Sequence, residues 1–344
     1  MLVSAAADRD LRLRVAEGAR PRPEYLMLEA EHGVELLDWS LLPGSGRGRS
    51  SWRSLVHVTT ALRALDRHDV IFSDGEHVGI PLAFAMQALG TTIPHLMIGH
   101  HLSTRAKSAL IHQLRAHRGM TRILVHSTFQ AELAHRKLGV PAAKLEYVPY
   151  HADTQFWHPT EAAEESLVVA AGREHRDYTT LASACEGLPV SVFVAAGSVH
   201  SPAASSRQPL DWPANFKHGF ADFLTLRDLY ARARVVVVPL METDFQAGVT
   251  TALEAMAMGK AVVISATKGQ TGVVRDGLTG ITVPPGDAGQ LRDAVAYLLD
   301  RPDERRRLGA AARQAVFDTY SLEAYTASLA EHMADLALGS RAAA

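Results

Sequence analysis

Short apolar runs rich in β-branched residues alternate with longer segments of helical periodicity along most of the 344 residues. This alternation is typical of parallel sheets covered by helices. Each half of the chain holds enough such runs for one doubly wound domain, so we predict an α/β protein with two Rossmann-like domains. The predicted strands are 34–38, 70–73, 95–98, 123–126 and 145–148 in the first half, and 167–171, 190–195, 235–239, 261–264 and 280–283 in the second.

The segment 150–166, "YHADTQFWHPTEAAEES", combines turn residues with a small acidic patch and is predicted to be a linker. The Ser- and Pro-rich stretch 198–213 is expected to be a long loop within the second domain. Ligands of doubly wound sheets bind at the carboxyl ends of the strands, so we expect the two domains to face a shared cleft. The predicted parts are an N-terminal domain at 1–158, a second domain at 159–320 and a C-terminal helix at 321–344.

Composition and charge narrow the class of protein. The chain is 47% hydrophobic and 21% charged, as in ordinary globular proteins, and its net charge of −2 gives no electrostatic reason to expect a nucleic-acid partner. The lone cysteine, Cys185, excludes an intramolecular disulfide and fits a reducing compartment. The sequence shows no signal peptide and no apolar run of about 18 residues. We therefore expect a soluble, cytoplasmic protein, whose oligomeric state stays open.

A basic segment, 105–122, contains five Lys or Arg residues and no acidic residue. Its apolar residues recur at roughly helical spacing, which favours an amphipathic helix with a solvated basic side. The alternative interpretation is a surface that binds an anionic membrane or an anionic acceptor. The apolar positions are Ala106, Leu110, Ile111 and Leu114.

The segment 245–260, "FQAGVTTALEAMAMGK", follows a strand and predicts a loop that leads into a short apolar helix. The first turn of a helix has free backbone N–H groups and a positive dipole, and Gly248 lets the backbone approach a ligand closely. We therefore predict that an anion binds there, most naturally a diphosphate. The residues expected to contact it are Phe245, Ala247, Gly248, Val249, Thr250 and Thr251.

Glu254 lies one turn beyond Thr250 on the same side of this predicted helix. A carboxylate can accept two hydrogen bonds from a vicinal diol, such as that of a ribose. The flanking apolar residues predict a buried helix, where an unpaired charge is costly, and this disfavours a merely solvent-facing glutamate. We therefore predict that Glu254 binds ribose.

The segment "VVVVPLMETDFQAGVTTALEAMAMGKAVVIS", followed by "GQTGVVRDGLTGITVPPGD", resembles the donor-binding half of retaining glycosyltransferases of the family-four type, with the GT-B fold. Those enzymes carry a Glu-x7-Glu pattern, "EAMA.G.PVV" and "DG.TG.LVPPGD". The likeness extends over about 166–320, and "VPYHADTQFWHP" is similar to the family's hinge. It implies a nucleoside-diphosphate-sugar donor and a terminal helix that crosses back to the first domain.

The resemblance also implies roles for single residues. "AAGREHRDYTTL" is similar to a family loop whose two cations bind the diphosphate, which implies this role for Arg173 and Arg176. Surface salt bridges are the alternative for both. "HLMIGHHLS" is similar to a segment whose histidine reaches the donor sugar, which implies His100, or else its neighbour His101. Gln246 replaces the first glutamate and would bind sugar hydroxyls, with a preference for a neutral over a cationic sugar.

These expectations converge on a retaining transferase that moves a sugar to a small-molecule acceptor of the metabolite or natural-product type. Catalysis would involve Arg173, Arg176, His100 and Gln246, with the leaving phosphate taking the acceptor's proton. We expect no metal, because there is no HExxH or Cys/His ligand set and the DxD string at 8–10 lies in the first residues. The nucleotide sugar is the expected co-substrate, with UDP favoured slightly over GDP.

Two alternatives remain open at this point. One is a nucleotide-sugar epimerase of the same fold, and the other is a non-catalytic partner that binds a nucleotide sugar. The second is suggested by Gln246 and by the N-terminal segment, which lacks the Gly-Gly loop that follows the first strand in the family. The acceptor therefore cannot be carried over from the resemblance.

Overall fold

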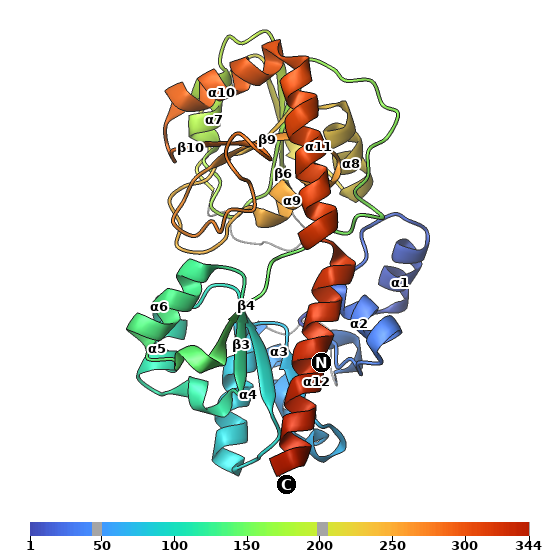
Figure 1. Ribbon diagram of the computed structural model, residues 1–344, viewed down its shortest axis with the longest axis vertical. Coiled ribbons are helices and arrows are strands. Elements are labelled where there is room, and N and C mark those ends of the chain that lie inside the picture. Colours follow the sequence, from blue (N-terminus) through green and yellow to red (C-terminus); the bar gives the residue numbers. More distant parts are fainter. Residues whose placement is uncertain (43–49, 198–205, 344) are drawn as a thin grey trace. The chain divides into compact units, whose positions relative to one another are not determined.

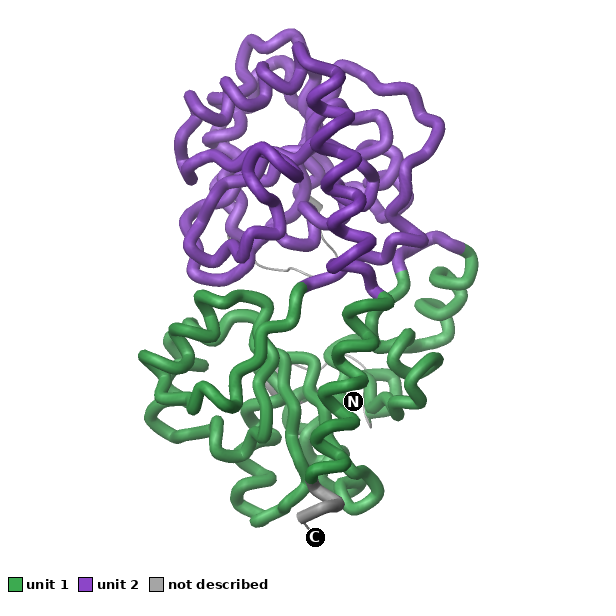
Figure 2. The backbone as a smooth tube through the Cα atoms, in the orientation of Figure 1, with its two compact units in different colours: residues 1–17, 22–149, 323–344 green, residues 18–21, 150–322 purple. Residues whose placement is uncertain are grey.

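The computed structural model describes residues 1–42, 50–197 and 206–343 (Figure 1). Of the predicted loop 198–213, residues 198–205 lie outside the described residues. The chain forms two compact units, which Figure 2 shows in different colours. Each unit is a parallel sheet with helices on its faces. Unit 1 consists of residues 1–17, 22–149 and 323–344, and unit 2 consists of residues 18–21 and 150–322.

The sheet of unit 1 has the strand order β1-β2-β3-β4, and all of its neighbouring strands are parallel. Its strands are β1 (Ile71–Ser73), β2 (His95–Gly99), β3 (Arg122–Val125) and β4 (Leu145–Tyr147). The helices are α1 (Arg9–Ala16), α2 (Glu24–His32), α3 (Ser50–Leu62), α4 (Glu76–Leu89), α5 (Arg105–His112), α6 (Thr128–Leu138) and most of α12 (Leu322–Ala343). Short 3-10 turns lie at Trp39–Leu41, Leu65–Arg67, Ala116–Gly119 and Ala142–Lys144.

Helices cover both faces of this sheet because its strands carry apolar residues on both sides. On one face, α4, α5 and α6 pack against β2 and β3 around Met97 and Ile123. On the other face, α2 and α12 pack against β1 and β2, where Leu329 and Met333 contact the cluster around Phe72. The last helix therefore belongs to the core of unit 1.

The predicted strand at 34–38 is wrong. In this region Leu2 makes single bridges to Leu37 and to Ser73, and no continuous ladder forms. The partner segment is short. Backbone pairing with Leu37 involves only Met1 and Val3, and the next residue, Ser4, donates from its N–H and its hydroxyl to the carboxylate of Asp74, at 2.5 and 2.6 Å. The residues after Leu2 lead directly into α1.

The sheet of unit 2 has the order β10-β9-β8-β5-β6-β7, again with parallel neighbours. The predicted strands of this half are confirmed, but β7 was missed because only Phe216 of its five residues is buried. The strands are β5 (Leu167–Ala171), β6 (Ser191–Gly197), β7 (Phe216–Phe220), β8 (Val235–Val238), β9 (Ala261–Ser265) and β10 (Ile281–Val283). The helices are α7 (Tyr178–Cys185), α8 (Phe223–Arg232), α9 (Val249–Ala257), α10 (Ala288–Asp300) and α11 (Pro302–Thr319).

Strand β8 shows how unit 2 is doubly wound. Its four valines are fully buried and alternate between two cores. Val236 and Val238 face the core formed with α8, α9 and α11, while Val235 and Val237 face the core formed with α7 and α10. The carboxyl end of β8, where the chain enters the loop before α9, is therefore held by packing on both faces.

The basic segment 105–122 forms a shorter helix than its periodicity suggested. Helix α5 ends at His112, and Arg115 has a φ of 54° before the next short turn. Of the four expected apolar positions, Ile111 is buried but Leu114 is 60% exposed. The five cations are distributed over a helix, a turn and a strand, so they do not share one helical face.

Close packing between α11 and the end of α9 gives a first prediction. A Cβ atom added to Gly309 of α11 would lie 2.0 Å from the carbonyl oxygen of Gly259, whereas one added to Gly339 of α12 would meet nothing within 4 Å. We expect Gly309→Ala to destabilise the protein by about 1–3 kcal/mol through overpacking. Gly339→Ala should leave stability unchanged or raise it by up to about 1 kcal/mol. Thermal unfolding of both variants checks this, and equal melting temperatures would contradict it.

Candidate functional site

The geometry at the start of α9 allows a ligand to approach the backbone closely. Gly248 precedes the helix with a φ of 74°, and a Cβ at this position would lie 2.6 Å from a methyl group of Val238. Glycine is therefore required by both conformation and space. No side chain of the described residues caps the helix, so the N–H groups of its first turn remain available at the carboxyl edge of the sheet. This is the geometry of an anion-binding helix start.

Arg176 lies directly against this helix start. Its side chain is 4% exposed, and Nη2 donates a hydrogen bond of 3.1 Å to Oγ1 of Thr251 in the first turn of α9. Nε donates to the carbonyl of Ala171 at 2.8 Å, and Nη1 donates to the carbonyl of Glu174 at 2.7 Å. A Cβ on Gly172 would lie 2.3 Å from Nη2, so this glycine is also required for the guanidinium to fit.

The buried charge of Arg176 is not neutralised by a carboxylate. Within the described ranges, no acidic side chain lies within 4 Å of it as an ion-pair partner. Glu174 contributes only its carbonyl oxygen, and Asp177 forms its ion pair with Arg207 at 3.4 Å. Burial lowers the pKa of Arg176, which reflects the cost of this charge. The alternative interpretation, a surface salt bridge of Arg176, is therefore wrong. The electrostatic potential at this position is positive.

Arg173 lies in the same loop but has a different environment. Its side chain is half-buried and makes no hydrogen bond or ion pair with any of the residues that the structure describes. Only its carbonyl is used, as the acceptor of a hydrogen bond from the hydroxyl of Ser206. The salt-bridge alternative therefore finds no support for Arg173, whose guanidinium can still take a ligand.

Glu254 lies one turn deeper along α9 and is buried, as the apolar residues around it predicted. Its side chain is 7% exposed, and burial raises its pKa to about 8, although Tyr230 and Arg176 counteract part of this rise. The hydroxyl of Tyr230 donates to Oε2 at 3.4 Å. The solvent-facing alternative is wrong, because this carboxyl group lies inside unit 2 and has one long hydrogen bond.

Gln246 and its neighbours line the loop between β8 and α9. Nε2 of Gln246 donates a hydrogen bond of 2.6 Å to Oγ1 of Thr271, while Oε1 is buried and has no partner among the described residues. The ring of Phe245 packs edge-on against His175, at 5.1 Å between centroids. The carbonyl of Ala247 accepts from Nε2 of Gln270 at 2.8 Å. The predicted site residues of this half thus lie at one edge of unit 2: Arg173, Arg176, Gln246 and Glu254.

Three further residues of this edge were not predicted. His175 has a φ of 52°, which is unusual for a non-glycine residue and occurs where strain is maintained by surrounding contacts. Tyr230 contacts Glu254 from α8, and Thr271 contacts Gln246 from the loop after β9. These pairs are separated by 24 and 25 residues, so no local sequence signal marks them.

The two predicted histidines lie in unit 1, directly after β2. His100 is exposed and makes a hydrogen bond of 2.9 Å between its Nε2 and the carbonyl of Asp74. The backbone N–H of His101 donates to Oε1 of Glu76 at 2.6 Å, and Lys107 pairs with Oε2 of the same carboxylate at 3.3 Å. Burial would raise the pKa of Glu76, but His100, Lys107 and the amide of His101 together lower it. Glu76 thus anchors the histidine loop as a carboxylate.

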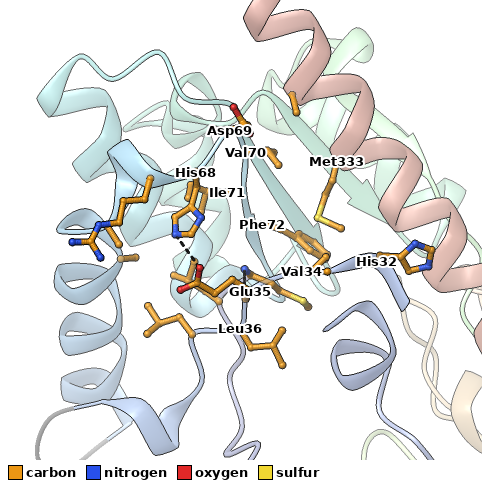
Figure 3. A pocket seen from close by; sticks show the side chains of 18 of the residues that line it. His32, Val34, Glu35, Leu36, His68, Asp69, Val70, Ile71, Phe72 and Met333 are labelled. Atoms are coloured by element: carbon orange, nitrogen blue, oxygen red, sulfur yellow. Dashed lines mark hydrogen bonds and ion pairs between the residues drawn. The ribbon is translucent and has the colours of Figure 1, made fainter. Parts of the chain in front are cut away.

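Unit 1 also contains a cavity of about 430 Å³, which Figure 3 shows from close by. It lies where the chain enters β1, and its lining includes Val34, Phe72 and Met333. Glu35 and His68 approach each other at 4.0 Å in this lining. None of the predicted site residues lines this cavity.

No three His, Cys, Asp or Glu side chains in residues 1–42, 50–197 and 206–343 gather closely enough to hold a metal ion. In the same ranges, no helix combines the length and the apolar composition that crossing a membrane requires.

The two α/β units, with a candidate anion site at the carboxyl edge of the second sheet, define the GT-B fold that the sequence predicted. Residues 156–315 match the family model of glycosyl transferases group 1. The Anabaena protein Alr3699/HepE, solved in complex with UDP and glucose, is similar in structure with a TM-score of 0.70 and 15% identity, covering 97% of this chain and 98% of that one.

Two curated relatives share sequence with the chain. A D-inositol 3-phosphate glycosyltransferase from Kribbella flavida is 40% identical over 87 residues, which cover 25% of this chain and 20% of that protein. An alpha-D-kanosaminyltransferase from Streptomyces kanamyceticus is 27% identical over 212 residues, which cover 55% of this chain and 54% of that protein. The chain thus spans about half, or less, of the length of these relatives. The structural similarity shows the GT-B fold.

The burial of Glu254 gives a second prediction, on the pH dependence of stability. Its pKa is about 8 in the folded protein, against an ordinary value of 4.5, so between these values the folded state holds a proton that the unfolded state releases. The free energy of unfolding should therefore fall as pH rises from about 5 to 8, by up to about 1.4 kcal/mol per pH unit. Glu254→Gln, which mimics the protonated form, should remove this slope.

Thermal unfolding of the wild-type protein and of the Glu254→Gln variant between pH 5 and 8 measures the difference in their stabilities. The variant should gain stability over the wild type as pH rises. Parallel pH profiles for the two proteins would show that Glu254 ionises normally in the fold.

Proposed function

We propose that the protein is a retaining glycosyltransferase that moves a sugar from a nucleoside-diphosphate sugar to a small-molecule acceptor. The observation that carries this proposal is Arg176, a buried guanidinium that has no carboxylate partner among the described residues and contacts the start of α9. A buried cation of this kind is costly unless an anion completes it. A diphosphate is the anion that also brings the ribose expected at Glu254.

The donor would bind along α9 from its start toward its interior. The N–H groups of Val249, Thr250 and Thr251 would bind the diphosphate, together with Arg173 and Arg176. The carboxyl group of Glu254, which has one long hydrogen bond among the described residues, would accept bonds from the ribose diol. Gln246 would bind a hydroxyl of the transferred sugar. Each of these roles uses a group whose hydrogen-bonding capacity the described protein leaves unfilled.

The proposed reaction is a substitution at the anomeric carbon with the same face retained. The bond from this carbon to the diphosphate oxygen breaks as the bond to the acceptor oxygen forms, and the acceptor's proton passes to the leaving phosphate. The positive groups at the start of α9 would stabilise the charge that develops on the diphosphate, as preorganised donors do in an oxyanion hole. These groups would allow transfer without a metal ion, so a chelator should leave the rate unchanged.

The comparisons support the donor class and the kind of acceptor. Similar structures were solved with UDP, with UDP and glucose, and with UDP-glucose, which supports UDP as the carrier. One curated relative is a D-inositol 3-phosphate glycosyltransferase, which supports a small-molecule acceptor, whereas the other is named for the kanosaminyl group that it transfers. His100, exposed on the loop after β2 in unit 1, is proposed to contact the donor sugar.

A nucleotide-binding partner without activity is the second candidate, because Gln246 replaces a glutamate of the related pattern. A thermal-shift screen with UDP, GDP, ADP and TDP, followed by a test for slow hydrolysis of UDP-glucose, separates the two. The proposed transferase should be stabilised by one nucleotide and should release UDP from the matching sugar donor. Stabilisation without any turnover would favour the binding partner.

A third prediction concerns Arg173, whose guanidinium has no partner among the residues that the structure describes. Charge-assisted hydrogen bonds contribute about 1.5–3 kcal/mol each, so Arg173→Ala should lower the rate of sugar transfer or donor hydrolysis by at least about tenfold. Arg207→Ala is the matched control, since Arg207 lies in the adjacent segment, is mostly exposed and pairs with Asp177. Initial rates with UDP-glucose measure both, and equal rates for the two variants would refute the diphosphate role of Arg173.

A further inference from the structure

A second pocket of unit 1 lies at the amino edge of its sheet, where the chain enters β2, β3 and β4. Its volume is about 390 Å³, and its walls are the end of α4 and the residues that directly precede these three strands. A Cβ on Gly119 would lie 2.1 Å from the carbonyl oxygen of Ala83, so the turn that carries Arg118 is packed tightly against α4. One wall of this amino-edge pocket is therefore fixed by backbone contact.

Two cations line the amino-edge pocket, and none of the described residues in its lining is acidic. Arg118 is exposed, and its guanidinium makes no hydrogen bond or ion pair with any residue that the structure describes. Nζ of Lys144 donates to the carbonyls of His117 and Met120, at 3.0 and 2.5 Å, which uses two of its three protons. Burial lowers the pKa of Lys144, and no carboxylate of the described chain counteracts this shift. Both positive charges are therefore left without a counter-charge from these residues.

His117, the neighbour of Arg118 in the chain, reports the electrostatic potential in this region. Burial lowers its pKa, a hydrogen bond to the carbonyl of Ile111 raises it, and three neighbouring charges lower it further. All three of these charges are cations: Lys144, Arg118 and Arg115. The potential at this edge of unit 1 is therefore positive.

Two threonines add hydroxyl donors to the pocket. Oγ1 of Thr121 accepts a hydrogen bond of 3.1 Å from the backbone N–H of His95. Oγ1 of Thr91 accepts one of 3.3 Å from the backbone N–H of Ile93. A backbone N–H can only donate, so each hydroxyl is the acceptor in its bond and keeps its own proton for another partner. Both hydroxyls can therefore donate to a ligand.

The unused donors and the positive charge predict an anionic ligand with several acceptor oxygens. A phosphomonoester fits, because its three terminal oxygens accept strong hydrogen bonds and its charge of about −1.5 to −2 at pH 7 matches the two positive charges of the pocket. A volume of about 390 Å³ lies within the range of small-molecule sites and exceeds what one phosphate group fills. The pocket therefore has room for a small phosphorylated molecule.

We infer that the amino-edge pocket is a second anion site of the protein, which binds a phosphomonoester through Arg118, Lys144 and the two threonine hydroxyls. This site goes beyond the proposed function, because His100 lies at the other edge of the same sheet. Strand β2 has five residues, which span about 16 Å between the two edges. The inference also assigns an anionic ligand to part of the basic segment 105–122, whose cation Arg118 lines the pocket.

The test measures binding of glycerol 3-phosphate by calorimetry, in the presence of saturating UDP to occupy the proposed diphosphate site. We expect Arg118→Gln to bind this probe at least about tenfold more weakly than the wild type, since a charge-assisted hydrogen bond is lost. Arg118→Lys, which keeps a point charge, should lose less. The matched control is Arg63→Gln, because Arg63 is an exposed arginine of unit 1 that does not line the pocket. It should bind the probe as the wild type does.

A second arm distinguishes a free phosphomonoester from the headgroup of a lipid. It compares binding to vesicles of phosphatidylcholine alone with binding to vesicles of phosphatidylcholine and phosphatidic acid in equal parts. Binding of glycerol 3-phosphate or of the phosphatidic acid vesicles that is weakened in Arg118→Gln but kept in Arg63→Gln supports the site and identifies the source of the phosphate. Equal affinities in these two variants, or no binding of either probe, would overturn the inference.

The inference and the proposed function can fail separately. UDP should bind equally well to the wild type and to Arg118→Gln, because Arg118 belongs to unit 1 and the start of α9 to unit 2. Displacement of glycerol 3-phosphate by UDP would place the probe at the diphosphate site and overturn the inference alone. A protein that binds glycerol 3-phosphate through Arg118 but binds no UDP would keep the inference and contradict the UDP assignment. Equal melting temperatures of the variants confirm that the substitutions leave the fold intact.

Discussion

The candidate site depends on one buried positive charge. Arg176 lies at the start of α9, where its guanidinium binds two backbone carbonyls and the hydroxyl of Thr251 but no carboxylate of the described ranges. Gly172 makes room for the guanidinium, and Gly248, which also has a positive φ, lets the backbone pass close to Val238 where the helix begins. The helix dipole and the guanidinium add their positive fields at the same place. In the proposed function, a bound diphosphate completes this arrangement.

The architecture explains why these groups meet. In a parallel sheet all strands end at the same edge, and the order β10-β9-β8-β5 makes the loops after β5, β8 and β9 neighbours. Arg176 comes from the first of these loops, Gln246 from the second and Thr271 from the third. The valines of β8, buried on both faces, hold the middle strand in place. Packing in the two cores therefore sets the positions of the loops. The side chains of the loops provide the chemical groups of the site.

The features that could be predicted from the sequence are those that short local patterns of residues determine. The run of valines in β8, the glycine before α9 and the apolar flanks of Glu254 specified a strand, a helix start and a buried carboxyl group. Contacts that join distant segments, such as those of Tyr230 with Glu254 and Thr271 with Gln246, depend on strand order, which no periodicity reports. The strand at 34–38 failed because Leu2 offers only single bridges, and β7 was missed because it is an exposed edge. Resemblance to known sequences, and not spacing alone, linked Arg173 and Arg176 to a diphosphate.

The most direct measurement is a crystal structure of the protein with UDP. The account predicts that diphosphate oxygens lie within about 3 Å of N–H groups in the first turn of α9, beside the guanidinium of Arg176, with the ribose hydroxyls at Glu254. A nucleotide bound elsewhere, or a diphosphate that contacts neither α9 nor Arg176, would contradict it.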